Sequence, residues 1–560
     1  MEQREKREGW HSGLGFILAA AGSAIGLGNI WRFPYITGQH GGGAFVLIYL
    51  LCVALIGLPV MLCEIALGRH TGRNPVGAFR RLNPDSCRLA HLFGAGMTLC
   101  GLLALFMRSW GWGGLFILIG VLIFKYRWTL VGVMGVVAGF VILSFYSVVA
   151  GWTIGYVFKA ATGQLAFETV DVAKESFGAF ITHPGWAILC HFLFMALCVA
   201  VVCRGIQGGI EKVSKVLMPL LFMILLALIV RGLTLPGAMA GVRYYLSPNF
   251  KLITPQCILV AVGLAFFSLS LGMGAMITYG SYVAKEQNLF KSAMAIVGLD
   301  VLVAFLAGLA IFPAVFALGF QPDQGSGLAF QALPAVFHHM PLGAAWAFLF
   351  FLLLLVAALT SGISLLEVVT AYWVDERRWS RRKATLVFGG CIFALGCLCA
   401  VSVANWNHIK PVEQALATLF GGVKDSFFVT METMADWMLA LGGLLIALFV
   451  GWVWGVRRAV DEIRQGSDNF ADVHLWSVMA GLKDDPSHNS DMHVFTLASL
   501  WGVFVRFICP VAIVIAFLNT IGWLELKGPE AKPAAVEQVA DEPVADESAS
   551  AIRNESHESM

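Results

Sequence analysis

An interruption within an apolar run constrains this chain more than any other feature. The stretch GSAIGLGNIWRFP, residues 22–34, places three glycines, one Asn and one Arg in a run of membrane-spanning length. Gly26 and Gly28 weaken helix and predict a break near 24–28. Backbone groups freed by a break are costly in hydrocarbon unless protein or a bound solute satisfies them. The stretch alone fits either a solute site or a helix packed closely through small residues.

A second interrupted stretch favours the solute site. The sequence FFSLSLGMG, residues 266–274, again places glycines and hydroxyls in the middle of a long apolar run. It lies in the other half of the chain. Corresponding Gly-interrupted segments in two halves are typical of transporters built from inverted repeats, with the solute bound between them.

The composition is that of a membrane protein. Hydrophobic residues make up 58% of the 560 residues and charged residues 13%, and the mean hydropathy is +0.78. A net charge of +2 without a basic, aromatic-interleaved stripe indicates no nucleic-acid partner. The twelve Cys form no CxxC pair, and the thirteen His are dispersed without a nucleophile or metal pattern. We therefore expect neither a disulfide framework nor an enzyme.

Eleven apolar runs predict an all-α polytopic membrane protein. The runs cover residues 13–38, 42–68, 130–158, 185–203, 213–235, 256–283, 290–318, 343–373, 384–404, 427–456 and 496–523, the first and sixth being broken. With a cytoplasmic N-terminus, the inside loops are rich in Arg and Lys and the outside loops are poor. This distribution satisfies the positive-inside rule.

The same runs predict the organisation of the chain. A further apolar region at about 89–124 lies in the first inside loop, and basic residues flank it on one side of the membrane. It is expected to be an inserted hairpin that crosses twice, with a re-entrant or surface-lying pair as the alternative. The expected parts are a cytoplasmic N-terminus 1–12, a first five-helix repeat 13–235, a second repeat 236–456, a cytoplasmic loop 457–495, an eleventh helix 496–523 and a disordered tail 524–560.

Several motifs in a fixed order resemble one family. They are GSAIGLGNIWRFPY, HGGGAF, EIALGR, SFYSVVAGW, AFFSLSLGMGAMITYGSY and ALTSGISLLEVVTAYWVDE. Together they are similar to bacterial members of the neurotransmitter:sodium symporter family, which include leucine and hydrophobic amino acid transporters. The resemblance implies a five-plus-five inverted-repeat fold, and sodium-coupled amino acid import across a bacterial inner membrane without an organic cofactor.

The resemblance also implies a substrate site at the two helix breaks. The amides of Leu27 and Gly28, with the hydroxyl of Tyr146, would hold the substrate carboxylate. Monoamine carriers of the family have an Asp where this chain has Gly26, so an amino acid is the expected substrate, and Gly362 would leave room for an aromatic ring. The full predicted set is Ala24, Gly26, Leu27, Gly28, Ile142, Tyr146, Phe267, Ser268, Ser270, Met273, Ser361 and Leu365.

Two sodium sites follow from the same resemblance. The first would combine the substrate carboxylate with Ala24, Asn29, Ser268 and Asp300. The second would combine Gly22, Ile25, Ala357, Thr360 and Ser361. The alternatives are hydroxyls that bond back to their own helix and a structural contact of Asn29 between helices.

Asp300 departs from the family pattern. The leucine transporter of the family has a neutral amide at the matching place and an acid one turn later, where this chain has Ala304. An acid within the membrane is a functional candidate by default. We expect Asp300 to supply a negative charge directly, so that transport needs no chloride.

Gates on both sides complete the expectations. Toward the outside, Tyr146 and Phe267 would cover the substrate and Arg32 would pair with Glu432, with Asp425 and Asp436 as alternatives. The predicted inner gate pairs Arg7 with Asp375 and adds Trp10, Ser281 and Tyr282.

Two competing functions remain at this stage. Proton coupling with Asp300 as the proton carrier is one alternative, and a sensor that binds an amino acid without transport is the other. The expected partners are an amino acid, sodium and the lipid bilayer. The sequence predicts no oligomeric state.

Overall fold

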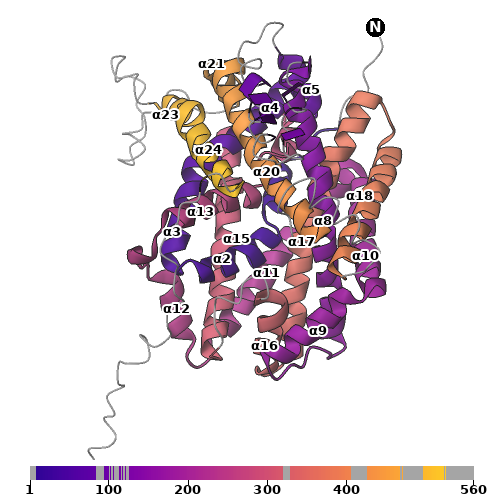
Figure 1. Ribbon diagram of the computed structural model, residues 1–560, viewed down its shortest axis with the longest axis vertical. Helices are drawn as coiled ribbons and strands as arrows, with labels where there is room; N and C mark the ends of the chain where they lie inside the picture. Colours follow the sequence, from indigo (N-terminus) through magenta and orange to yellow (C-terminus); the bar gives the residue numbers. More distant parts are fainter. Residues whose placement is uncertain are drawn as a thin grey trace, which may run out of the picture.

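The fold is a bundle of helices packed side by side (Figure 1). The computed structural model describes residues 8–83, 125–319, 328–404, 426–466, 470, 496–521 and 524, with scattered residues between 94 and 121. Every element in these residues is helical, which confirms the all-α prediction.

Nine helices in the described residues are long and apolar enough to cross a membrane, and a bent pair makes up to ten. The first half of the chain contributes α3–η2–α4 (Gly43–Thr71), α8 (Thr129–Ala161), α10 (Pro184–Val202) and η3–α11 (Ile206–Leu233). The second half contributes α15 (Leu289–Ala317), α17 (Gly343–Arg377), α18 (Arg381–Val403), α20–η7–α21 (Phe427–Arg464) and α23–η9–α24 (Leu497–Thr520).

The first and sixth predicted runs are broken, as expected. In the first, α1 (Gly13–Ala24) is followed by η1 (Gly28–Arg32) and α2 (Phe33–Gln39), with a bend of 50° at the break. In the sixth, α13 (Pro255–Ser268) and α14 (Ala275–Gly280) are separated by a turn. The predicted positions of both breaks therefore agree with the structure.

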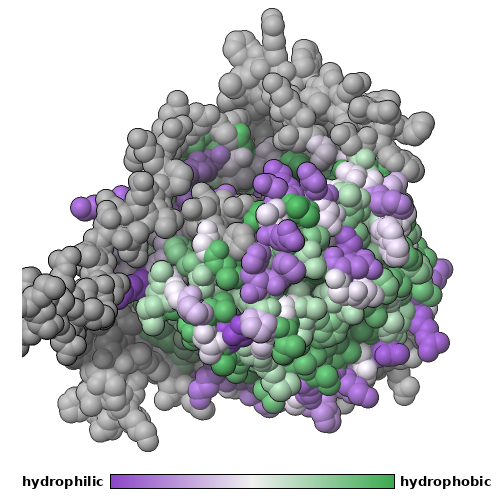
Figure 2. Space-filling model, turned by 90° about the horizontal axis from the view of Figure 1, so that it is seen from below, coloured by the Kyte–Doolittle hydropathy of each residue, from purple (hydrophilic) through white to green (hydrophobic). Residues whose placement is uncertain are grey.

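Shorter helices connect the spans. They are α5 (Pro75–Leu82), α9 (Val170–Thr182), α12 (Ala238–Leu246), η4 (Phe250–Leu252), η6 (Leu328–Ala332) and α16 (Leu333–His338). Figure 1 places α4, α5 and α21 at one end of the bundle and α9, α12 and α16 at the other. At this second end hydrophilic and hydrophobic residues are interspersed (Figure 2).

Local sequence signals set many helix starts. Ser12 accepts a hydrogen bond from the amide of Gly15 at 3.0 Å, and Asn74 accepts one from Gly77 at 3.1 Å. Thr254 caps α13 directly before Pro255, which needs no amide partner at the first helical position. The caps at Ser12 and Thr254 fix where the two broken helices begin, and the cap at Asn74 fixes the start of α5.

Two long helices form the centre of the bundle. Helix α17 packs along α8, and α1 packs against α11, α15 and α17. Helix α14 lies against α4, and α13 lies against α3. Both broken helices are therefore held by neighbours along their length, which satisfies the requirement that irregular backbone at membrane depth be covered by protein.

The apolar region at 89–124 is described only in part. Among its described residues, the backbone of Gly101 lies against Gly113, and Gly120 lies against Gly94. The two halves of the region therefore run antiparallel beside each other. Whether the pair crosses the membrane stays a prediction, as do the proposed boundaries of the two repeats.

Candidate functional site

The first helix break leaves carbonyl groups without helical partners. Helix α1 stops at Ala24, the backbone of Ile25 is extended with φ −72° and ψ 103°, and the helix resumes as a π-helical turn at Gly28. The last carbonyls of a helix lack intrahelical donors. Here side-chain hydroxyls from other helices take that place.

The second break is a tight turn that faces the first. Three of its residues have positive φ, namely Ser270 at 53°, Gly272 at 82° and Gly274 at 75°. Ser270 Oγ donates to the carbonyl of Ser23 at 2.8 Å, which joins the two breaks directly. Two segments almost 250 positions apart therefore form one polar region inside the bundle.

A buried carboxylate lies beside both breaks. Asp300 is fully buried on α15, and its oxygens accept hydrogen bonds from Asn29 Nδ2 at 2.8 Å and Ser268 Oγ at 2.9 Å. Tyr49 Oη lies 3.1 Å from Ser268 Oγ and 3.4 Å from Asp300. The structure thus brings together three of the four residues predicted for the first sodium site, and Ala24 ends the helix next to them.

A second group of oxygens surrounds the end of α1. Ser361 Oγ lies 3.4 Å from the Gly22 carbonyl and 3.3 Å from the Ile25 carbonyl. Thr360 Oγ1 lies 3.5 Å from Ile25 and 3.0 Å from Ala357 in its own helix. All five predicted members of the second sodium set therefore lie together. Oxygens of this kind suit hard cations.

The groups predicted to face the substrate also lie close together. The amide of Leu27 donates to Tyr146 Oη at 3.3 Å. An ideal Cβ on Gly26 would lie 2.6 Å from Ser361 Oγ and 3.1 Å from Tyr146 Oη, so only a residue without a side chain allows this approach. Of the apolar residues in the predicted substrate set, Ala24, Leu27, Ile142, Met273 and Leu365 are buried and Phe267 is partly exposed.

Gly362 has a different role from the one that its sequence position suggested. An ideal Cβ there would lie 2.9 Å from both Cys198 Sγ and the Phe194 ring of α10. The glycine therefore allows α17 to pack against α10 and does not enlarge a substrate pocket. Position in a motif could not reveal this, because the facing residues lie more than 160 positions earlier.

In the predicted outer gate, Arg32 pairs with Asp436 and not with Glu432. Arg32 Nη2 lies 3.3 Å from Asp436 Oδ2, and Glu432 lies one turn earlier on α20. The guanidinium carbon of Arg32 also lies 4.7 Å from the centre of the Phe267 ring. Asp425 lies outside the described residues. The predicted partner Glu432 is therefore wrong by one helical turn, and the alternative Asp436 takes its place.

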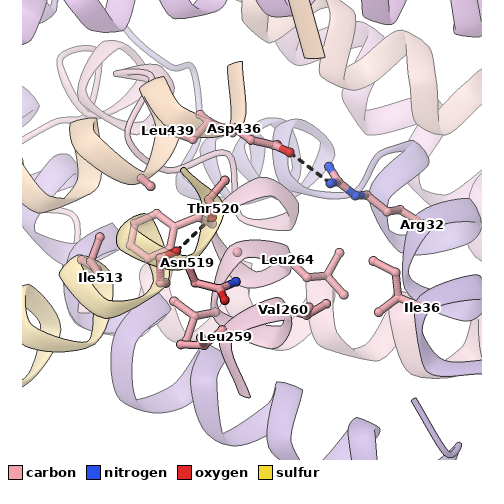
Figure 3. A pocket seen from close by; sticks show the side chains of 15 residues that line it. Arg32, Ile36, Leu259, Val260, Leu264, Asp436, Leu439, Ile513, Asn519 and Thr520 are labelled. Carbon is pink, nitrogen blue, oxygen red and sulfur yellow. Dashed lines mark hydrogen bonds and ion pairs between the residues drawn. The ribbon is translucent and has the colours of Figure 1, made fainter. Parts of the chain in front are cut away.

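The pair between Arg32 and Asp436 lies at the edge of a cavity of about 170 Å³ (Figure 3). In Figure 3 the two side chains face each other, Arg32 from the end of η1 and Asp436 from α20. Apolar side chains of α13 and the end of α24 line the rest. The labelled lining residues include Ile36, Leu259, Val260, Leu264, Ile513, Asn519 and Thr520.

At the other end, Trp10 closes the bundle. Its indole Nε1 donates to the carbonyl of Tyr279 at 3.0 Å, and its amide donates to Tyr282 at 3.2 Å. Ser281 is buried nearby and donates to Thr278 within its own helix. Trp10 and Tyr282, both predicted for the inner gate, are therefore in direct contact.

The partner predicted for Asp375 cannot be placed. Arg7 lies outside the described residues. Asp375 Oδ2 accepts hydrogen bonds from the amide of Asn74 at 3.1 Å and from its side chain at 3.2 Å. The carboxylate thus also connects α17 to the start of α5.

Two buried glutamates were missed as functional candidates. Glu64 is fully buried and accepts a hydrogen bond from the amide of Gly272 at 2.7 Å, which holds the turn of the second break. Glu367 is fully buried and accepts from Tyr282 Oη at 2.8 Å and from Arg381 Nη1 at 2.6 Å. Both belong to quoted motifs, EIALGR and SLLEVV, and an acid within an apolar run was the available signal.

Comparison with known proteins gives a consistent result. The sequence model of the sodium:neurotransmitter symporter family matches residues 7–110 and 175–482. The sodium-dependent transporter YhdH of Bacillus subtilis is 38% identical over 92% of this chain and 98% of its own length. A sodium-dependent transporter of Haemophilus influenzae is 33% identical over 92% and 99% of the two chains. The crystal structure of MhsT in complex with L-phenylalanine has a TM-score of 0.72, with 38% identity, and covers 92% of this chain and 100% of MhsT.

The bundle with two broken helices facing each other defines a multi-pass membrane transporter of the inverted-repeat class. The chain belongs to the sodium:neurotransmitter symporter family. It is therefore a sodium-coupled transporter and not an enzyme.

Proposed function

We propose that this protein imports a hydrophobic or aromatic amino acid together with sodium by alternating access. The observation that carries the proposal is the contact of Tyr146 Oη with the amide of Leu27 at the first break. Backbone amides at the start of a helix, together with a nearby hydroxyl, can bind a carboxylate. Gly26 stands where monoamine carriers of the family have an Asp, so no protein carboxylate takes the place of the substrate carboxylate. The phenylalanine bound to MhsT, a 38% identical structure, supports the same substrate class.

Two groups of oxygens are the proposed sodium sites. The first is formed by Asn29, Ser268 and Asp300 with the Ala24 carbonyl and the substrate carboxylate. The second consists of the carbonyls of Gly22, Ile25 and Ala357 and the hydroxyls of Thr360 and Ser361. A sodium ion in either group would fix the end of α1 and favour the substrate-binding form.

The protein is proposed to lie in a bacterial inner membrane with its N-terminus in the cytoplasm. The end of the bundle with α4, α5 and α21 would then face the cytoplasm, and the end with α9, α12 and α16 would face outward. Tyr146, Phe267 and the pair of Arg32 with Asp436 would form the outer gate. Trp10, Ser281, Tyr282, Asp375 and Arg7 would form the inner gate.

The outer gate gives a testable difference between two neighbouring acids. Asp436→Asn should release bound amino acid about fivefold faster, because it weakens a partly exposed ion pair worth ~1 kcal/mol. Glu432→Gln is the matched control on the same helix and should change release little. Stopped-flow displacement of a labelled amino acid measures both rates. Equal effects of the two substitutions would contradict the assignment of Asp436 as the partner of Arg32.

The substrate and ion are tested together by equilibrium binding to the purified protein. Radiolabelled Leu, Trp, Tyr, Met and Ala should bind in sodium chloride and in sodium gluconate but not in potassium chloride. Binding in gluconate is expected because Asp300 supplies the negative charge that chloride would otherwise provide. Binding that collapses in gluconate would reject chloride independence, and absence of sodium-dependent binding of all five would reject the pocket assignment.

Proton coupling remains the second candidate because Asp300 is an acid buried within a membrane-spanning helix, a position typical of proton relays. Uptake driven by a pH gradient without sodium would favour it. A sensor would bind an amino acid but show no counterflow in proteoliposomes. Counterflow is the result that we expect.

A further inference from the structure

The last membrane helix carries a single charged residue in its apolar length. Arg506 lies within the π-helical turn η9 (Phe504–Ile508), between α23 (Leu497–Val503) and α24 (Cys509–Thr520), and its side chain is exposed on the outer surface of the bundle. A charge that faces hydrocarbon is costly unless it reaches the interface or pairs with an opposite charge. Its position therefore needs a physical reason.

The packing of the helix defines the depth of Arg506. Gly451 of η7 (Phe449–Gly455) lies against Arg506, and Gly502 lies against Val456. The two helices thus run antiparallel, and Val456 is followed directly by the exposed Arg457 and its neighbour Arg458. Arg506 is therefore about one helical turn deeper than these two basic residues at the start of α21 (Val456–Arg464).

The direction of the side chain leads toward that interface. Side chains in a helix point toward its N-terminus. For α23–η9–α24 this is the end near Arg457, which the proposed orientation places on the cytoplasmic side. A long Arg side chain can thus bring its guanidinium to the level of lipid headgroups.

Neighbouring groups hold the guanidinium but do not neutralise it. Arg506 Nε donates to the carbonyl of Gly451 at 3.0 Å, and the guanidinium carbon lies 5.6 Å from the centre of the Trp452 ring. Trp452 Nε1 in turn donates to the carbonyl of Arg506 at 3.2 Å. Within the described part of the chain, no acid pairs with Arg506 and its two terminal nitrogens make no hydrogen bond.

We propose that Arg506 and Trp452 form a binding site for the phosphate of an anionic phospholipid. The lipid would lie in the leaflet on the same side of the membrane as the N-terminus of the chain. The two free guanidinium nitrogens match two phosphate oxygens. Trp favours the interfacial region, and the cytoplasmic leaflet carries the anionic lipids. The acyl chains would lie on exposed apolar residues next to the guanidinium, which are Val503, Phe507 and Val511.

Lipid retention by the wild-type protein is the first test. The protein is reconstituted in nanodiscs with equal amounts of phosphatidylglycerol and phosphatidylcholine. Native mass spectrometry then identifies the lipids that remain bound to the protein after it is released from the nanodisc. Phosphatidylglycerol should be retained about fivefold over phosphatidylcholine, because a basic residue near the membrane surface is worth roughly 1 kcal/mol toward anionic lipid. Equal retention of the two lipids would overturn the proposal without any need for a variant.

A pair of variants locates the site. Arg506→Gln should lose the preference for phosphatidylglycerol, whereas Arg204→Gln, which changes an exposed Arg beyond the end of α10, should keep it. Sodium-dependent amino acid binding shows that each variant is folded. Unchanged lipid preference in Arg506→Gln would contradict the site. A change in oligomeric state with unchanged lipid preference would also contradict the site. It would assign Arg506 to contact with a second copy of the chain.

Discussion

Replacing Asp300 by Asn should lower the apparent sodium affinity about 10- to 100-fold, equivalent to about 1.4–2.8 kcal/mol. The substitution keeps the shape of the side chain but removes the negative charge that faces Asn29, Ser268 and Tyr49. A hard cation in this group of oxygens would lose its only full negative charge from the described protein residues. Sodium titration of labelled amino acid binding measures the change.

The same variant also tests the role proposed for chloride. With the carboxylate gone, binding in sodium chloride should exceed binding in sodium gluconate, since an external anion can partly replace the lost charge. Asp171→Asn, at an exposed position in the first turn of α9, is the matched control and should behave as the wild type. If the apparent sodium affinity of Asp300→Asn equals that of the wild type, Asp300 is not part of the sodium site.

Replacing Gly272 by Ala should destabilise the protein and abolish sodium-dependent binding. The residue has φ +82°, where a side chain costs about 1–2 kcal/mol. An added Cβ would also lie 2.1 Å from the carbonyl of Leu439 on α20, and overpacking of this kind costs about 1–3 kcal/mol. The turn would have to move, and with it the amide that donates to Glu64.

Gly263 provides a control in the same broken helix. An ideal Cβ at this position has no neighbour within 4 Å, and the residue lies inside α13 with ordinary helical backbone. Gly263→Ala should therefore be neutral or slightly stabilising, by about 0.5–1 kcal/mol. The stabilities of the two variants are compared by heating each protein and measuring the fraction that stays folded by size-exclusion chromatography. Equal stability of both would show that the turn at Gly272 tolerates a side chain.

The fold was largely predictable because its signals are local. A bilayer requires about 20 consecutive apolar residues, so each span is visible within one window of sequence. Glycines mark the helix breaks for the same reason, as at Gly26 and Gly272. Two boundaries differ clearly. The fifth span begins at Ile206 instead of residue 213, and the tenth span continues beyond residue 456 as α21 (Val456–Arg464). The apolar pattern ends there, while the helix continues through charged residues.

The site was predictable only where a motif fixes both the residue and its partner. The hydroxyls of Thr360 and Ser361 and the carbonyls at the end of α1 belong to two such motifs, and the structure places them together. The partner of Arg32 depends on the register of α20, and one turn separates Asp436 from Glu432. The contact of Gly362 with α10 depends on the packing of helices distant in sequence, which no local pattern reports.

The contacts of Glu367 have a consequence for the inner gate that we propose at Trp10 and Tyr282. Tyr282, at the end of the broken sixth helix, donates to Glu367 Oε1, while Arg381 holds the same carboxylate through two hydrogen bonds at 2.6 and 3.2 Å. Of the hydrogen bonds that this carboxylate accepts, movement of α14 would break only the one from Tyr282. Because Arg381 follows Glu367 by 14 positions, at the start of the next helix, the charge would stay neutralised. Such a movement would leave Glu367 paired with Arg381 and would avoid the cost of about 3–5 kcal/mol of an unpaired buried charge.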